Sequence, residues 1–200
     1  MRHLLKITLV TLVLGAAWMV AARAQQSSSS DKKPTEDKKP AEAQMQMPQP
    51  GPEMERLKFL LGSWDWKAAY LKSPEMPNGG DDSGWYKAEL GPGGFSIIAD
   101  FEADGPMGKE IGHQILSWDP KQKGYLAVTV GNSFPGALIG SSHWEGDNLV
   151  TDGQYDEGGV TMHVRSTYSN ITAKSTHMTD AFLAPDGTYH VIWEGEATRK

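Results

Sequence analysis

Hydrophobic and polar residues alternate along most of the chain from about residue 63 onward. In WDWKAAY (64–70), Trp64, Trp66 and Tyr70 fall on one side of an extended chain, and Asp65 and Lys67 fall on the other. Such a period of two is typical of β-strands with one buried face. Clusters of Gly, Pro, Asn and Asp separate the alternating runs at short intervals, as tight turns do. The pattern predicts strands near 63–71, 83–90, 95–103, 110–119, 123–131, 137–145, 148–154, 159–168, 174–183 and 188–199.

One short helix is predicted before the first strand. Met54, Leu57, Leu60 and Leu61 have helical spacing over barely two turns, and Gly62 follows them where a helix often ends. Many short antiparallel strands behind one short helix favour an all-β fold, an up-and-down antiparallel barrel of about ten strands. A β-sandwich is the alternative, but a barrel leaves no free sheet edge.

The first 52 residues differ in composition from the rest. A basic start, an apolar run over 7–21 and the sequence Ala22-Arg23-Ala24 are typical of a signal peptide that is cleaved after Ala24. The apolar run is short for a membrane span, so no stable membrane anchor is expected. Residues 25–52 are rich in Ser, Lys and Pro and offer a core almost nothing, which predicts a disordered spacer. We therefore expect a signal peptide (1–24), a spacer (25–52), a barrel domain (53–200) and a secreted or periplasmic location.

Charge and cysteine content narrow the function classes. The formal net charge is −6 at pH 7, which makes nucleic acid and anionic membrane surfaces poor partners. The chain has no cysteine, so disulfides and thiolate chemistry are excluded. The expected partner is a small hydrophobic molecule.

Several stretches resemble known families. Gly62-Ser63-Trp64, placed after a short helix, resembles the G-x-W signature of the lipocalins and the wider calycin superfamily. In those barrels the tryptophan closes the base and stacks with an arginine of the last strand, a role that the resemblance assigns here to Arg199. More closely, PEMERLKFLLGSWDW, GHQILSWDPKQKGYLAV and GTYHVIWEGEATRK resemble an uncharacterised bacterial secreted family, the domain of unknown function 1579. This resemblance covers about residues 53–200 and implies a calycin-like barrel without an established activity.

The face of the predicted barrel that carries the aromatic residues is the candidate ligand site. Alternation along the last strand places Tyr189, Val191, Trp193 and Arg199 on one face. A filled core is the alternative, because small barrels often have no spare volume. If there is a cavity, its ligand is expected to be small and apolar or aromatic. The residues predicted to bind it are Trp66, Tyr70, Phe101, His113, Met162 and Trp193, and those predicted to close the barrel are Gly62, Trp64 and Arg199.

The histidines of the domain suggest a second hypothesis, a haem or metal site. None has the spacing of a metal-ligand motif, so no metal ligands are assigned. His113 and His177 are the two whose position in the pattern allows an inward orientation. Nitrobindins, another calycin-like group, bind haem through a histidine and open with G-x-W-x-G. This chain has Asp65 and Trp66 in that motif instead, which disfavours haem; no cofactor is expected.

No motif supports catalysis directly. GNSFPG (131–136) resembles a nucleophile elbow but has one residue too many, and the strand-to-helix turn that the motif requires is absent. No catalytic residue is assigned. The third hypothesis is a hydrolase or isomerase that uses an acid in the barrel mouth, and Asp100, Glu102 and Asp180 are the strand acids whose face the pattern leaves open. A raised pKa for one of them would favour this hypothesis. The first hypothesis remains an exported, non-enzymatic barrel.

Overall fold

The computed structural model describes residues 47–73 and 76–200. The predicted signal peptide (1–24) and the predicted spacer as far as residue 46 lie outside the described residues. Within the described part, no helix is long and apolar enough to cross a membrane.

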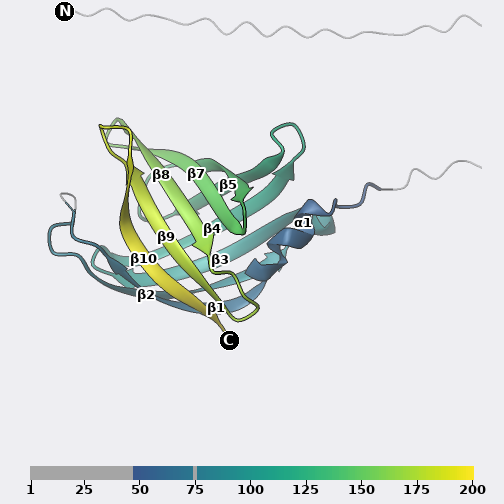
Figure 1. Ribbon diagram of the computed structural model, residues 1–200, viewed down its shortest axis with the longest axis horizontal. Coiled ribbons are helices and arrows are strands. Elements are labelled where there is room, and N and C mark those ends of the chain that lie inside the picture. The colour runs from purple at the N-terminus through teal and green to yellow at the C-terminus, as the bar shows by residue number, and fades with distance from the viewer. Residues whose placement is uncertain (1–46, 74–75) are drawn as a thin grey trace, which may run out of the picture. The chain divides into compact units, whose positions relative to one another are not determined.

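Ten antiparallel strands form one closed barrel in the described part of the chain (Figure 1). Each strand pairs with the next along the chain, and the last pairs with the first. A short helix, α1 (Glu53–Arg56), continues into the 3-10 turn η1 (Leu57–Leu60) before the first strand. The predicted all-β barrel with a short helix in front is therefore confirmed, and the sandwich alternative is wrong. The strands are β1 (Gly62–Tyr70), β2 (Gly80–Leu90), β3 (Ser96–Gly105), β4 (Gly108–Asp119), β5 (Gly124–Gly131), β6 (Leu138–Glu145), β7 (Asn148–Glu157), β8 (Val160–Ser169), β9 (Ser175–Leu183) and β10 (Tyr189–Arg199).

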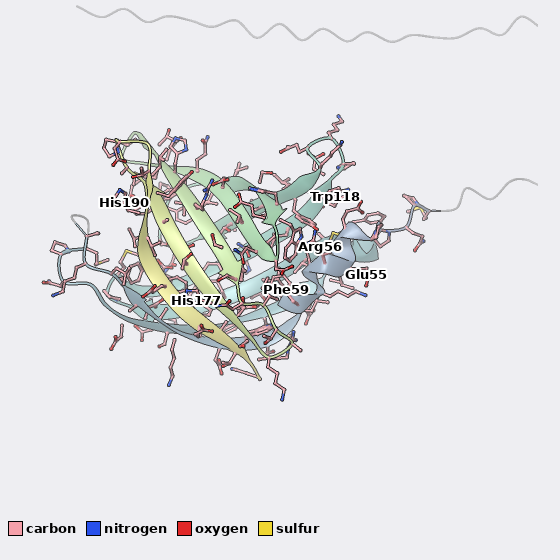
Figure 2. The ribbon with its side chains drawn as sticks, viewed as in Figure 1. Glu55, Arg56, Phe59, Trp118, His177 and His190 are labelled. Atoms are coloured by element: carbon pink, nitrogen blue, oxygen red, sulfur yellow. The ribbon has the colours of Figure 1, made fainter. Side chains whose placement is uncertain are left out.

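The two ends of the barrel differ, and we call them the helix end and the loop end. At the helix end β1 begins and β10 finishes, and the buried side chains of Met54, Leu57 and Leu60 join the core there. Phe59 packs edge-on against both Trp144 and Tyr168, with ring centroids 6.0 Å apart in each pair. Figure 2 shows Arg56 and Phe59 on this short helical segment. The loop end carries the connections β1–β2, β3–β4, β5–β6, β7–β8 and β9–β10.

Trp64 and Arg199 join the first and last strands at the helix end. Trp64 is fully buried, and its indole Nε1 donates a hydrogen bond to the carbonyl of Leu60 at 3.1 Å. The Arg199 guanidinium carbon lies 4.3 Å from the centroid of the Trp64 ring, and Nη2 donates to the carbonyl of Phe59 at 2.9 Å. Gly62 has a φ of +99°, and a Cβ there would meet Nη1 of Arg199 at 2.7 Å. A glycine at this position therefore allows both the left-handed backbone and the arginine.

A β-bulge in β10 corrects the predicted face of that strand. The register with β9 shifts between Val191 and Trp193, so one extra residue lies between them. An extra residue reverses the alternation of side chains on its far side. Val191 is accordingly 43% exposed, and Tyr189 lies outside the barrel against Arg165, whose guanidinium carbon is 4.3 Å from its ring centroid. The prediction that Tyr189, Val191 and Trp193 share one face is therefore wrong for Tyr189 and Val191, the two residues that precede the bulge.

Two inward-facing glycines make room for large aromatic side chains. Gly84 in β2 pairs with Trp66 in β1, and a Cβ at Gly84 would overlap the indole. Gly112 in β4 pairs with Phe101 in β3, where a Cβ would overlap the phenyl ring. Each aromatic ring thus lies over a glycine on the neighbouring strand. This arrangement keeps the rings against the wall and leaves space at the centre of the barrel.

Candidate functional site

The barrel encloses a cavity of about 270 Å³. Every strand contributes side chains to its wall, and Leu60 of η1 lies at its helix end. Of the residues predicted to bind a ligand, Trp66, Tyr70, Phe101 and Trp193 line this cavity. Their role in binding stays a prediction, but the alternation of the sequence had placed Trp66, Tyr70 and Trp193 on the inner face.

Met162 does not reach the cavity wall. It lies near the loop-end start of β8, half-buried, and the lining residues of that strand begin at Val164. The prediction of Met162 as a lining residue was therefore wrong by about one pleat of the strand. The alternation predicts which face a residue occupies, but not how far along the barrel the empty space extends.

The inward orientation considered for His113 and His177 is also wrong. His113 lies on the outer surface, where its Nδ1 is 2.7 Å from Oδ1 of Asp100 and its side chain is 63% exposed. Its apolar neighbours, Ile111 and Ile115, made that face look buried, but both are exposed as well. His177 likewise faces outward and pairs with Glu196 at 3.1 Å. Figure 2 shows His177 on the outside of the β9–β10 region.

Asp82 is the buried acid at the centre of the polar part of the cavity. It lies in β2, lines the cavity and is 7% exposed. Its Oδ2 accepts hydrogen bonds from the indole N–H groups of Trp193 at 2.7 Å and Trp66 at 3.3 Å. Two strong donors on one oxygen stabilise the negative charge of a carboxylate. The same contacts fix the orientation of the two indoles, so the aromatic wall and the acid form one unit.

Two further acids, Glu110 and Asp180, line the same cavity. Burial raises the pKa of Asp180, an effect that the hydrogen bond from Ser166 Oγ opposes and the charge of Asp82 reinforces. Burial also raises the pKa of Glu110, with smaller contributions from Asp82 and Asp180 and an opposing hydrogen bond from Ser133. The charge of Asp82 therefore acts on both Asp180 and Glu110, and the charge of Asp180 acts on Glu110.

Tyrosine hydroxyls complete the polar lining. Burial raises the pKa of Tyr168 to about 12, and the charge of Asp180 adds to the shift. The pKa of Tyr70 is also raised, first by burial and then by Glu110, Asp82 and Asp180. Both hydroxyls stay protonated at neutral pH and are available as donors. The hydroxyl of Tyr86 is buried and has no hydrogen-bond partner within the described protein.

The acids of the cavity were only partly foreseen from the sequence. Asp180 was one of three acids whose face was left open, and it is inside. Asp100 and Glu102 are outside, paired with His113 and with Lys109. Asp82 was missed because the predicted second strand began at residue 83, whereas β2 begins at Gly80. Glu110 was missed although it alternates with Gln114 and Leu116, both of which face the cavity. That alternation was the signal available for Glu110.

The titration of Asp180 leads to a testable expectation for stability. A carboxyl group with a raised native pKa binds its proton more tightly in the folded state, so the free energy of unfolding falls as pH rises above the ordinary aspartate pKa of about 3.9. The asparagine in Asp180→Asn cannot ionise, so the variant does not lose stability in this way as pH rises. We expect the variant and the natural protein to have similar melting temperatures near pH 4 and the variant to become increasingly more stable toward pH 8. Thermal unfolding across this range measures the difference.

Asp100→Asn is the control for the change in net charge, because it removes one acid from the outer surface. A difference between Asp180→Asn and the natural protein that stays constant with pH would contradict the expectation.

Metal binding has no evident site in the part of the chain that the structure describes. No group of three or more His, Asp or Glu residues lies in a position to hold a metal ion there.

Comparison with known proteins gives a family and a fold. The family model "Protein of unknown function (DUF1579)" matches residues 49–199. A search of curated proteins found no match. Among solved structures, the crystal structure of Rv2717c from M. tuberculosis is similar with a TM-score of 0.55 and 15% identity, over 76% of this chain and 99% of that chain. This likeness concerns the fold alone.

Two other barrels are more distant. The S-type phycobiliprotein lyase CPES from Guillardia theta has a TM-score of 0.49 at 12% identity, over 73% of this chain and 88% of that chain. The structure of EF1p2_mFAP2b bound to DFHBI has a TM-score of 0.40 at 9% identity, over 74% of this chain and 98% of that chain.

Proposed function

We propose that this chain, which belongs to the DUF1579 family of proteins of unknown function, binds a small molecule inside its barrel. The observation that carries the proposal is the cavity of about 270 Å³, whose lining includes four predicted aromatic residues, Trp66, Tyr70, Phe101 and Trp193, and three acids, Asp82, Glu110 and Asp180. Ligand sites in proteins are concave and mostly apolar, with a few polar groups that fix orientation. The volume suits a molecule with one or two rings rather than a large cofactor.

The architecture supports binding rather than a filled core. Small barrels commonly fill their interior with side chains. Here the wall includes alanines, among them Ala88, Ala99, Ala103 and Ala127, and the rings of Trp66 and Phe101 are held against the wall over glycines. Small residues on the inner face and rings drawn aside both preserve the central space.

We also propose that the protein is exported. The support for export is the sequence of residues 1–24, with its basic start, apolar run and Ala22-Arg23-Ala24. Native mass spectrometry of protein recovered from the periplasm or medium tests export and binding together. We expect a mature chain that begins at Gln25 and a fraction that retains a small molecule. A mass that includes residues 1–24 would contradict the proposed cleavage.

Cavity filling tests the site directly with prodan, a small uncharged dye whose fluorescence responds to polarity. Ala99 lines the cavity, and its strand neighbours on the inner face are Ala88 and Gln114. Ala99→Phe places a ring in the central space, and we expect prodan to bind at least about tenfold more weakly, a loss of about 1.4 kcal/mol. Ala69→Phe makes the same exchange at an outward-facing position of β1 and is expected to leave binding unchanged.

Thermal unfolding establishes that both variants are folded, and Thr129→Phe, at another lining position, replaces Ala99→Phe if the latter does not fold. The proposal would be contradicted if the natural protein did not bind prodan. It would also be contradicted if both cavity variants bound prodan as tightly as the natural protein does.

Acid–base catalysis is a second candidate, favoured by one observation: Asp180 lies in the cavity with a raised pKa and accepts a hydrogen bond from Ser166. Raised carboxyl pKa values are frequent among general acids. If the natural protein hydrolyses p-nitrophenyl acetate and Asp180→Asn does not, the result would support this candidate. Equal rates of hydrolysis by the two proteins would contradict it.

A further inference from the structure

The cavity contains negative groups without positive ones. Asp82, Glu110 and Asp180 come from β2, β4 and β9 and line the same space. Among the described residues that line it, none is Lys, Arg or His. All three acids lie toward the loop-end part of their strands, as Tyr70 does in β1. Their charges add to the effect of burial in raising the pKa of Tyr70. An interior of this kind attracts a positive charge.

Neutral donors compensate the acids only in part. Asp82 accepts from two indoles, and Asp180 accepts from Ser166. Hydrogen bonds from neutral groups lower the cost of burying a carboxylate, but they leave its net charge in place. No basic side chain among the described lining residues neutralises this charge. A bound cation would remove both the burial cost and the repulsion.

The walls around the acids are aromatic. Trp66 and Trp193 are fixed there by their bonds to Asp82, and Tyr70 and Phe101 line the same cavity. The faces of aromatic rings carry partial negative charge and attract organic cations, with tryptophan the most effective. Carboxylates combined with aromatic faces recognise ammonium groups, whereas aromatic faces offer no lone pairs to a metal ion.

Tyr86 provides a second, independent indication of a ligand. Its side chain lines the cavity, the residue is 8% exposed, and its hydroxyl has no hydrogen-bond partner in the described protein. A buried hydroxyl without a partner is costly, so such groups usually serve a bound molecule or water. Tyr86 lies four residues beyond Asp82 on β2, about 13 Å along the strand at a rise of ~3.3 Å per residue. The cavity therefore has an acidic part and, toward the helix end, the side chain of Tyr86, whose buried hydroxyl has no partner among the described residues.

We propose that the ligand is a small organic cation, an amine or quaternary ammonium with an apolar body. Its charged group lies among Asp82, Glu110 and Asp180 between the aromatic rings, and its body extends toward Tyr86. This inference rests on the proposed function, because it names the class of molecule that the barrel binds.

Displacement of bound prodan by three matched compounds tests the inference. Benzyltrimethylammonium carries a fixed positive charge, neopentylbenzene is its uncharged isostere, and phenylmethanesulfonate is an anion of similar shape. We expect the cation to displace prodan at a concentration at least about tenfold lower than the uncharged compound, because the cavity adds an electrostatic attraction to the same apolar contact. The sulfonate is expected not to compete.

Isosteric variants then assign the attraction to the cavity. Glu110→Gln and Asp180→Asn each remove one charge from inside, and each is expected to weaken the cation about tenfold while changing the uncharged compound less than about twofold. Asp100→Asn removes the same charge from the outer surface and is the matched control. It is expected to leave the affinity for the cation unchanged.

The outcomes separate the inference from the proposed function. If prodan does not bind the natural protein at all, the proposed function fails. If prodan binds and the uncharged compound competes as well as the cation, the barrel binds small molecules but not preferentially cations, and the inference is overturned. The inference is also overturned if Asp100→Asn weakens the cation as much as Asp180→Asn, because the effect then reflects the net charge of the protein.

Discussion

Trp64→Ala is expected to destabilise the barrel by about 3–5 kcal/mol, the usual cost of removing a large buried aromatic side chain. Trp64 is fully buried and stacks on Tyr86, with ring centroids 5.8 Å apart. The variant also loses the hydrogen bond to Leu60 and the contact with Arg199. Since the free energy of unfolding of a domain is only about 5–15 kcal/mol, this loss removes a large part of it. Urea unfolding followed by circular dichroism measures the loss.

Trp85→Ala is the matched control, because Trp85 lies on β2 next to Tyr86 but faces outward and is 38% exposed. We expect this variant to lose less than about 1 kcal/mol, as surface substitutions usually do. Equal losses for Trp64→Ala and Trp85→Ala would show that the Trp64–Arg199 contact does not hold the helix end of the barrel together.

Gly84→Val is expected to destabilise the barrel by about 3 kcal/mol or more, at the upper end of the cost of overpacking. A Cβ at this position would overlap both the carbonyl oxygen of Glu102 on the neighbouring strand and the indole of Trp66. Backbone cannot move aside as a flexible side chain does, so the valine must separate β2 from β3 or displace the indole. Displacing Trp66 also breaks its hydrogen bond to Asp82. We therefore expect prodan binding to fall together with stability.

Ser83→Val tests the same exchange of a small residue for valine one position earlier in β2, on the outer face. It is expected to change the free energy of unfolding by less than about 0.5 kcal/mol. If thermal unfolding and prodan binding show the two variants to be alike, the glycine is not required for the position of Trp66.

The closed barrel was predictable because its main determinants are periodic. Alternation along β1 placed Trp64, Trp66 and Tyr70 on one face, and that face is where the structure has them. The same rule failed in β10 at the bulge before Trp193, because one extra residue reverses the pattern and nothing local marks the insertion. Periodicity is therefore informative only within uninterrupted stretches of a strand.

The site was harder to predict than the fold, because polarity is a poor guide to orientation here. Ile111 and Ile115 are apolar but exposed, and their position beside His113 led to the wrong prediction that this histidine could face inward. Asp82 is charged but buried, and the sequence pattern did not indicate it. A buried acid depends on partners from other strands, in this case the indoles of Trp66 and Trp193. The separation along the chain between Asp82 and Trp193 is 111 residues, and no local pattern connects them. Only the closed fold shows that the acid has donors.

The contact between Arg199 and the carbonyl of Phe59 has a consequence for how the barrel folds. The two residues are 140 positions apart in the chain, so the seam between β1 and β10 requires the two ends of the domain to meet. Contacts of such long range delay folding, because the entropy of closing the loop must be lost before the contact forms. We expect the seam to form late, and until it does the edges of β1 and β10 are open to pairing with other chains. Slow refolding, and aggregation at high protein concentration, would then result from the late pairing of β1 with β10 and not from the cavity.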